Sequence, residues 1–199
     1  MDPITFVDLK TQAEILGGDI RQAMEKVMSH GMFIMGPEVY ELEKKLSEFT
    51  GAKHVVSCSS GTDALLMALM AIDVGPGDAV FTSPFTFVAT AEVISLLGAT
   101  PVFVDIRKDT FNIDPVKLAQ AVAHIDKNHA GKSLTPKCIL PVDIFGLPAE
   151  YDAIFGIADR FGLVVIEDAA QSLGGRIDDR MAGNLAHMGA TSFFPAKPL

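Results

Sequence analysis

The sequence predicts an α/β protein in which a mostly parallel sheet carries helices on both faces. Two observations support this expectation. Short apolar segments of strand length alternate with helical patterns along the chain, and several of these segments are apolar nearly throughout. Strands have this composition when helices cover both faces of a parallel sheet. The short connections between the segments favour a doubly wound arrangement.

Each element has its own signal. Two helices, at about 12–29 and 37–49, precede the sheet, and the second is amphipathic with one charged face. The turn GPGD at 75–78 precedes a strand, and Pro115 opens a helix as its first residue. The expected strands are 54–58, 79–82, 101–105, 138–143, 163–168 and 190–194. The expected helices between them are 60–72, 86–97, 115–124 and 150–161, and 123–137 is expected to be a polar surface loop.

Composition narrows the functional classes. The 199 residues are 49% hydrophobic and carry a formal charge of −9. An acidic chain without basic runs disfavours broad binding to nucleic acid or to an anionic membrane. Cys58 and Cys138 lie far apart in apolar runs, which is typical of reduced thiols in a cytoplasmic protein. The five histidines show no metal-ligand spacing, so no metal site is expected.

One motif invites a nucleotide-binding interpretation. The segment AGKS at 130–133 would need a glycine five positions before Gly131, directly after a strand. Position 126 is Asp, and the segment follows a helix. No G-x-G-x-x-G follows any expected strand either. A solvated loop is therefore the better interpretation of 130–133.

The stretch VSCSSGTDALLMAL at 56–69 predicts the end of a strand, a small polar turn and a helix. Ser60 can cap this helix, and Asp63 can reach back toward the cap as in a capping box. Gly61 allows a ligand to approach the backbone closely. The first-turn amides of Gly61, Thr62 and Asp63 suit a phosphate group. Taken alone, the stretch is more simply interpreted as a well-capped structural helix.

The stretch LVVIEDAAQSLGG at 163–175 places Asp168 at the carboxyl end of a buried strand, where open α/β sheets bind ligands. A buried carboxylate is costly unless something cationic pairs with it. Asp168 could hold Mg²⁺ beside a nucleotide, hydrogen-bond a protonated ring nitrogen, or cap the next helix. The missing phosphate loop weighs against the first of these roles.

The segment TSFFPAKPL at 191–199 carries one lysine, Lys197, after a strand that ends at the same edge of the sheet. Burial at such a place favours the neutral amine. A neutral amine can form a Schiff base with an aldehyde. Taken alone, a surface lysine is the simpler interpretation.

In combination these motifs resemble one family. The ordered segments SSGTDAL, SPFTFVATAEVISLLGATPVFVDI, PVDIFG, VIEDAAQSLGG and TSFFPAKPL are similar to those of the DegT/DnrJ/EryC1/StrS sugar aminotransferases. FVDLK and GPEVYELEKKLSEFTGAKHVVSC match as well, so the resemblance covers essentially the whole chain. It implies the aspartate-aminotransferase fold (fold type I) and the cofactor pyridoxal 5′-phosphate, PLP.

The resemblance also implies roles for individual residues. Lys197 matches the lysine that forms the Schiff base with PLP and later moves the substrate proton. Asp168 matches the aspartate that keeps the pyridine nitrogen protonated, which makes the ring an electron sink. Gln171 matches the side chain beside the ring and its phenolic oxygen. Phe87 matches the aromatic residue that stacks on the ring, whereas the adjacent Phe85 is expected to serve packing.

The cofactor phosphate has its own implied set, which is Gly61, Thr62 and Ser192. The implied reaction is a two-stage transamination in which L-glutamate donates the amine and a nucleotide-linked keto-sugar accepts it. The segments SFFPAKPL and GPEV look most like the subgroup that acts on UDP-2-acetamido-2-deoxy-3-oxo-glucuronate for surface polysaccharides. Many relatives aminate the 4-keto position instead. A dehydratase of the same fold is a third option, but that branch replaces the lysine with histidine, and Lys197 argues against it.

The chain departs from the family pattern in two places and in length. Asp143 precedes IFG where relatives often carry histidine, and the 123–137 loop is longer than usual. Family members are about twice as long, and the part after the lysine supplies a C-terminal small domain and residues of the partner's site in a homodimer. We therefore expect an N-terminal helical segment at 1–50 and an incomplete PLP-binding large domain at 51–199. With the small domain absent, the 199-residue chain alone is expected to be catalytically silent.

Overall fold

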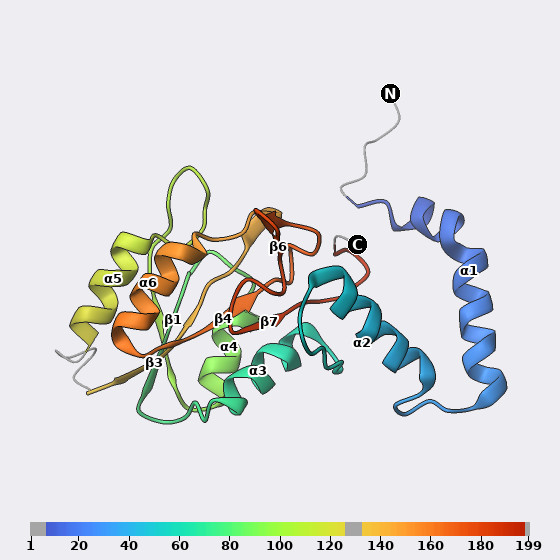
Figure 1. The fold of residues 1–199 in the computed structure, drawn as a ribbon, viewed down its shortest axis with the longest axis horizontal. Coiled ribbons are helices and arrows are strands. Elements are labelled where there is room, and N and C mark those ends of the chain that lie inside the picture. The colour runs from blue at the N-terminus through green and yellow to red at the C-terminus, as the bar shows by residue number, and fades with distance from the viewer. Residues whose placement is uncertain (1–6, 126–132, 198–199) are drawn as a thin grey trace.

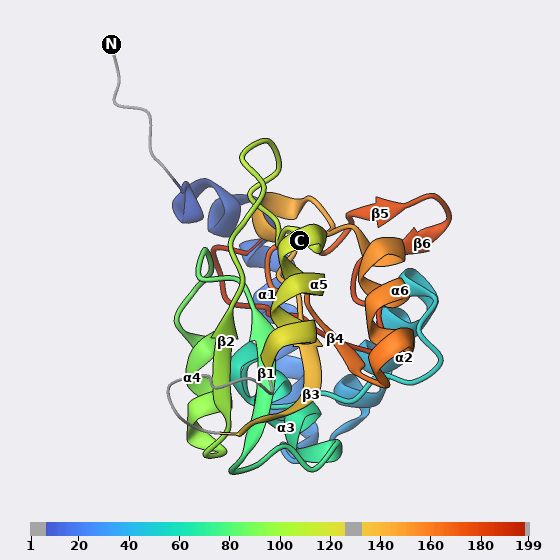
Figure 2. The ribbon, with the colours of Figure 1, turned by 90° about the vertical axis from the view of Figure 1, so that its left-hand side faces the viewer.

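A five-stranded parallel sheet forms the centre of the molecule. The computed structural model describes residues 7–125 and 133–197. The sheet order is β2-β1-β3-β4-β7, and each neighbouring pair is parallel. Figure 2 shows β2, β1, β3 and β4 side by side in this order. The strands are β1 (Asp78–Thr82), β2 (Thr100–Phe103), β3 (Thr135–Leu140), β4 (Val164–Asp168) and β7 (Met188–Ala190).

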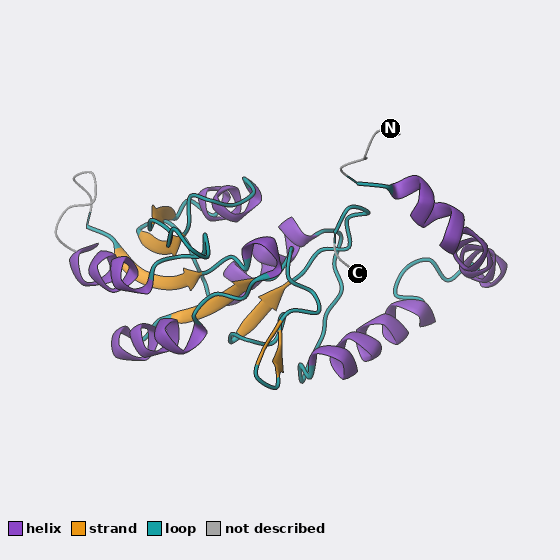
Figure 3. Cartoon of the chain, turned by 90° about the horizontal axis from the view of Figure 1, so that it is seen from above, coloured by secondary structure: helices purple, strands orange, loops and turns teal. Residues whose placement is uncertain are grey.

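Helices cover both faces of the sheet. On one face lie α5 (Pro115–His124) and α6 (Tyr151–Phe161), and on the other lie α3 (Gly61–Ala71) and α4 (Ala89–Leu96) (Figure 1). Figure 3 shows the same layers from above. These four helices lie where the sequence predicts them, to within three residues at each end. The expected α/β arrangement is confirmed.

Side chains of the buried strands alternate between the two faces and so contribute to two separate cores. On β4, Val165 packs in the core that includes α5 and α6, whereas Ile166 packs in the core that includes α3 and α4. The same alternation continues to the end of the strand. Glu167 therefore contacts the α6 side and Asp168 the α4 side, which places two buried carboxyl groups on opposite faces at one sheet edge.

Three expected extended segments differ from the structure. The strand expected at 54–58 does not form, and the Ser57 N–H and hydroxyl both donate to Glu43 Oε1 at 2.8 Å. A strand needs backbone partners, and none of the described strands pairs with this segment. The strand expected at 138–143 spans Thr135–Leu140 instead. The strand expected at 190–194 ends at Ala190, and Phe193 and Phe194 are exposed.

Some smaller elements were not predicted. An antiparallel pair, β5 (Arg176–Ile177) and β6 (Arg180–Met181), lies between β4 and β7 in the chain. A short 3-10 turn, η2 (Ile144–Gly146), follows β3. The loop expected at 123–137 is shorter at both ends, since α5 reaches His124 and β3 begins at Thr135; residues 126–132, with most of AGKS, lie outside the described residues.

The two N-terminal helices extend away from the sheet (Figure 1). They are α1 (Leu9–His30) and α2 (Pro37–Thr50), close to the expected bounds. No residue of α1 is buried, and its link to α2 includes a Lys26–Glu38 ion pair at 3.0 Å. α2 is tied to the sheet domain by Asn184, whose amide donates to the Thr50 carbonyl at 3.3 Å. Across the described ranges, no helix is both long and apolar enough to cross a membrane.

Candidate active site

The carboxyl edge of the sheet, on the face covered by α3 and α4, gathers most of the expected site residues. Asp168 is the last residue of β4, and Ser192 follows β7, the next strand in the sheet. Gly61 and Thr62 open α3, which packs against β4 and β7. Open parallel sheets bind ligands at this edge because helix N-termini and strand ends meet there.

Asp168 is a buried carboxylate with two neutral hydrogen-bond donors. Its Oδ2 accepts from the Thr90 hydroxyl at 2.8 Å, and its Oδ1 accepts from the Ala170 N–H at 3.2 Å. The side chain is only 5% exposed. Burial raises the pKa of Asp168 above its ordinary value, whereas the two hydrogen bonds and the nearby positive charge of Lys197 oppose the rise. The residue is thus a carboxylate that a cationic N–H donor would stabilise.

Two threonines extend this hydrogen bond into a chain, and sequence reasoning missed both. Thr90 Oγ1 lies 2.8 Å from Thr86 Oγ1. Because the single hydroxyl proton of Thr90 is donated to Asp168, Thr86 must donate to Thr90. The spacing of four residues in FTFVAT is compatible with this pairing, but the link to Asp168 spans 78 positions and has no local signal.

The first turn of α3 and the segment after β7 touch directly. Ser60 caps α3, and its hydroxyl oxygen accepts from the Asp63 N–H at 3.1 Å, as expected. The Asp63 carboxylate, however, accepts from the Ser59 and Ser60 hydroxyls rather than from a backbone N–H. A Cβ on Gly61 would lie 2.9 Å from Ser192 Cβ, so only glycine permits this approach.

The two aromatic residues of the FTF segment have different surroundings. Phe85 packs against Phe111 and Phe145, with ring centroids 5.4 and 5.8 Å apart, so its expected packing role is confirmed. Phe87 is 70% exposed, and none of the ring pairs between described residues includes it. Its ring is therefore available to a planar ligand.

Lys197 and Gln171 lie in turns and are less buried than Asp168. Lys197 is half-buried in a turn closed by its own N–H, which donates to the Phe194 carbonyl at 2.8 Å. Its positive charge lowers the pKa of Asp168, a smaller effect than burial and the two hydrogen bonds. Gln171 is exposed and lies in a series of turns after β4 rather than in a helix. Asp168 consequently does not cap a helix, although it binds the Ala170 N–H as a cap would.

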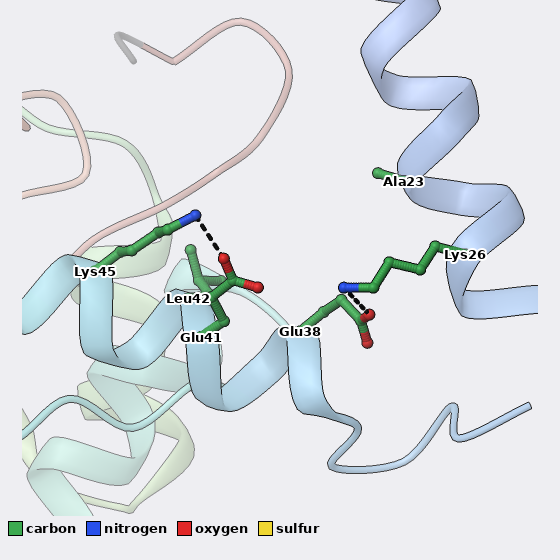
Figure 4. A pocket seen from close by; sticks show the side chains of 6 residues that line it. All are labelled: Ala23, Lys26, Glu38, Glu41, Leu42 and Lys45. Atoms are coloured by element: carbon green, nitrogen blue, oxygen red, sulfur yellow. Dashed lines mark ion pairs between the residues drawn. The ribbon is translucent and has the colours of Figure 1, made fainter. Parts of the chain in front are cut away.

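Two cavities lie away from this edge of the sheet. One of about 320 Å³ lies between α1 and α2 (Figure 4). Its charged side chains pair with one another, Lys26 with Glu38 at 3.0 Å and Lys45 with Glu41 at 2.7 Å. Another, of about 410 Å³, lies beside residues 148–153 and Ile177. Neither contains an expected site residue. In the described part of the chain, no group of three or more His, Cys, Asp or Glu side chains is arranged to hold a metal ion.

The residues at the sheet edge fit PLP. Asp168 can accept the ring N–H, because its present donors are an uncharged hydroxyl and an uncharged amide. The N–H groups of Gly61 and Thr62 have no acceptor within their own helix. They lie at the positive end of the helix dipole, beside the Ser192 hydroxyl, where a phosphate binds well.

Comparisons with known proteins agree with this geometry. The model of the DegT/DnrJ/EryC1/StrS aminotransferase family matches residues 14–199. A UDP-2-acetamido-2-deoxy-3-oxo-D-glucuronate aminotransferase from Pseudomonas aeruginosa is 48% identical over 198 residues, which are 98% of this chain and 52% of the relative. The chain thus spans about half the length of the curated relatives it matches.

Solved structures give the same result. A DegT/DnrJ/EryC1/StrS aminotransferase from Brucella abortus superposes with a TM-score of 0.94 at 51% identity, covering 99% of this chain and 52% of that one. NtdA from Bacillus subtilis, solved with bound cofactor PMP, superposes with a TM-score of 0.84 at 35% identity, covering 99% and 42%. The family and such neighbours indicate pyridoxal phosphate as the cofactor. On sequence, fold and site geometry together, this chain belongs to the DegT/DnrJ/EryC1/StrS aminotransferase family.

Proposed function

We propose that this chain supplies the PLP-binding site of an enzyme that aminates a UDP-linked 3-keto sugar acid with L-glutamate as the amino donor. The observation that carries the proposal is the buried Asp168 carboxylate, held by Thr90 at the sheet edge to which the segment carrying Lys197 also leads. When bound, PLP supplies an electron sink for the carbanion that forms as the substrate loses its proton.

The chain's own residues then have separate tasks. Lys197 holds the cofactor covalently in the resting state and carries the proton between the substrate carbon and the cofactor carbon. Asp168 keeps the ring nitrogen protonated, because a buried carboxylate strongly favours a positive partner. The Thr86–Thr90 chain fixes the orientation of the Asp168 carboxylate. Gln171 lies beside the ring and its phenolic oxygen in this proposal.

The phosphate and the ring faces are bound by other groups. The Gly61 and Thr62 N–H groups and the Ser192 hydroxyl bind the phosphate, whose charge the α3 dipole favours. The Phe87 ring, exposed just before α4, stacks on one face of the cofactor.

The substrate assignment rests on the relatives' names. The Pseudomonas aeruginosa relative is named for a UDP-linked 3-oxo-glucuronate, which favours the 3-keto over the 4-keto position. We place the enzyme in surface polysaccharide synthesis, in the cytoplasm and as a homodimer. The free thiols of Cys58 and Cys138 support a reducing compartment.

Covalent trapping tests the role of Lys197. The protein is mixed with PLP, reduced with borohydride and digested, and the modified peptide is identified by mass spectrometry. We expect the label on Lys197 and its loss in Lys197→Ala. Lys53→Ala removes an exposed lysine away from the site and should keep the label on Lys197. Equal labelling of Lys197→Ala would overturn the assignment.

A substrate comparison tests the reaction. The enzyme is offered L-glutamate with a UDP-linked 3-keto sugar acid or a UDP-linked 4-keto sugar, and 2-oxoglutarate is measured. We expect turnover of the 3-keto compound. Turnover of the 4-keto compound alone would replace the substrate assignment and leave the PLP site intact.

A further inference from the structure

Two buried carboxyl groups lie behind the candidate site and have no part in the proposed chemistry. Asp143 follows β3 and Glu167 precedes Asp168 on β4, and both side chains are completely buried. They lie on the α6 face of the sheet, opposite the Thr90–Asp168 hydrogen bond. Among the described residues, no ion pair involves either of them. Their hydrogen bonds show what they hold in place.

Glu167 fixes the loop that leads into β7. Its Oε1 accepts from the Gly183 N–H at 2.6 Å, and its Oε2 accepts from the Leu185 N–H at 2.9 Å. β7 itself has three residues and leads to Ser192 and Lys197. Because so short an edge strand has few ladder bonds of its own, the two bonds to Glu167 help to set its register against β4.

Asp143 fixes the segments on the other side of β4. Its Oδ1 accepts from the Ala149 N–H at 2.9 Å and from the Tyr151 hydroxyl at 3.0 Å. Its Oδ2 receives a longer bond, 3.4 Å, from Ser172 in the turn after Asp168. Its own N–H donates to the Asp168 carbonyl at 3.1 Å. Asp143 thus holds the turn that follows the cofactor-facing carboxylate.

The two carboxyl groups are neighbours on one face of the sheet, and this arrangement requires a proton. The parallel bridge between Val142 and Asp168 puts the next residue, Asp143, and the preceding one, Glu167, together on the α6 face, where the charge of Glu167 raises the pKa of Asp143. Two ionised carboxylates in contact and out of water repel strongly, so one of them is protonated. Both oxygens of Glu167 accept backbone N–H groups, which favours its ionised form. The proton therefore belongs on Asp143 Oδ2, since Oδ1 already accepts two donors.

We propose that Asp143 and Glu167 share one proton as a positioning pair, which ties the turn after Asp168 to the loop before β7 and so sets the spacing between Asp168 and the Ser192–Lys197 segment. Asp143 is the donor and Glu167 the acceptor. The pair acts through Asp168 and Lys197 and does not touch the cofactor. Its effect on PLP binding rests on the function proposed above, whereas the shared proton itself is independent of that function.

The proposal predicts an asymmetry between two isosteric substitutions. In Asp143→Asn the amide N–H₂ still donates to Glu167 and the amide oxygen still accepts from Ala149 and Tyr151. In Glu167→Gln an N–H₂ group faces a backbone N–H and one of the two loop bonds is lost. We expect the PLP dissociation constant of Asp143→Asn to stay within twofold of the parent protein. We expect that of Glu167→Gln to rise at least tenfold.

PLP binding by the full protein is titrated by absorbance, with far-UV circular dichroism as the check that each variant folds. Equal weakening in both variants, or none in either, would overturn the proposal. If Glu167→Gln fails to fold, infrared difference spectra of the parent protein and of Asp143→Asn still test whether Asp143 carries the shared proton. A carbonyl band of a buried protonated carboxylic acid is expected at neutral pH in the parent and not in Asp143→Asn. Its absence from the parent, or its persistence in Asp143→Asn, refutes the shared proton even if the protein never binds PLP.

Discussion

At the residue scale, the Thr90 hydroxyl is the group that most directly controls Asp168. Replacing Thr90 with Val keeps the shape of the side chain but removes the donor to Asp168 Oδ2. A hydrogen bond to a charged group contributes about 1.5–3 kcal/mol, so we expect PLP affinity to fall roughly tenfold or more. Thr90→Ser keeps the hydroxyl and serves as the control. If the Val and Ser variants bind PLP equally well, Thr90 has no part in orienting Asp168.

Asp143 gives a second residue-scale prediction, in the pH dependence of stability. Burial and the neighbouring Glu167 charge raise the pKa of Asp143 to about 8, whereas an unfolded aspartate titrates near 3.9. Between these values the folded state binds one more proton than the unfolded state, so this group makes stability fall as pH rises. The other ionisable groups that act on it are Glu167 and Tyr151.

The measurement compares the free energy of unfolding of the parent protein and Asp143→Asn in urea at pH 5, 6 and 7. Asn does not titrate. The difference in the free energy of unfolding between the two proteins should therefore change by about 1.4 kcal/mol per pH unit, and the variant becomes relatively more stable as pH rises. A difference that is constant with pH would mean that Asp143 is ionised in the folded protein.

Some residues of the candidate site could be predicted from local sequence motifs, and others could not. Asp168, Lys197 and Gly61 lie in compact motifs whose chemistry is visible locally, and the structure places them at one sheet edge. Thr90 could not be found in this way, because its partner lies 78 positions away and any threonine on α4 would look the same. The roles assigned to Gln171 and Phe87 stay predictions.

At the scale of elements, α3 and the segment after β7 approach each other closely in the candidate site. A Cβ on Gly61 would meet Ser192 Cβ at 2.9 Å and the Thr191 carbonyl at 3.2 Å. Gly61→Ala should therefore destabilise the protein by about 1–3 kcal/mol through overpacking, although alanine is the better helix former. It should also weaken PLP binding by displacing Ser192.

Gly156→Ala is the matched control, since Gly156 lies in α6 with nothing within 4 Å of its added Cβ. That variant should be stabilised by up to about 1 kcal/mol. Urea unfolding measures both effects. Stabilisation in both variants would show that the packing against Ser192 tolerates a methyl group.

Helices and strands could be predicted where neighbouring residues in the chain stabilise them, as caps do, or where they are completely buried. α5 begins at Pro115 behind the Asp114 cap and ends at His124, as the sequence indicates. The segment 54–58 has a strand-like sequence but no strand partner among the described residues. The strand predicted there from its composition was therefore wrong. The β5–β6 pair has only two residues in each strand, too few for a period-2 pattern to be visible.

At the scale of the whole molecule, the α/β sandwich follows from the sequence, whereas the placement of the N-terminal helices does not. Apolar strands predict a sheet that is covered on both faces, and two separate cores confirm it. The sequence predicts α1 as a helix but does not say what its apolar side chains contact. The division into 1–50 and 51–199 stays a prediction, supported by the few links between α2 and the sheet domain.

The exposed apolar face of α1 leads to the last prediction. Ile20, Met24 and Met28 recur at a spacing of four residues, so they share one face of the helix, and all three are exposed. Large apolar patches in contact with water promote association. We therefore expect a purified polypeptide of residues 1–199 to self-associate, and the double variant Met24→Gln, Met28→Gln to do so less. Val116→Gln, which removes an equally exposed apolar residue from α5, is the control. Sedimentation velocity over a range of concentrations measures the association; a monomer at every concentration, or an equal effect of the control, would show that the α1 face is not responsible.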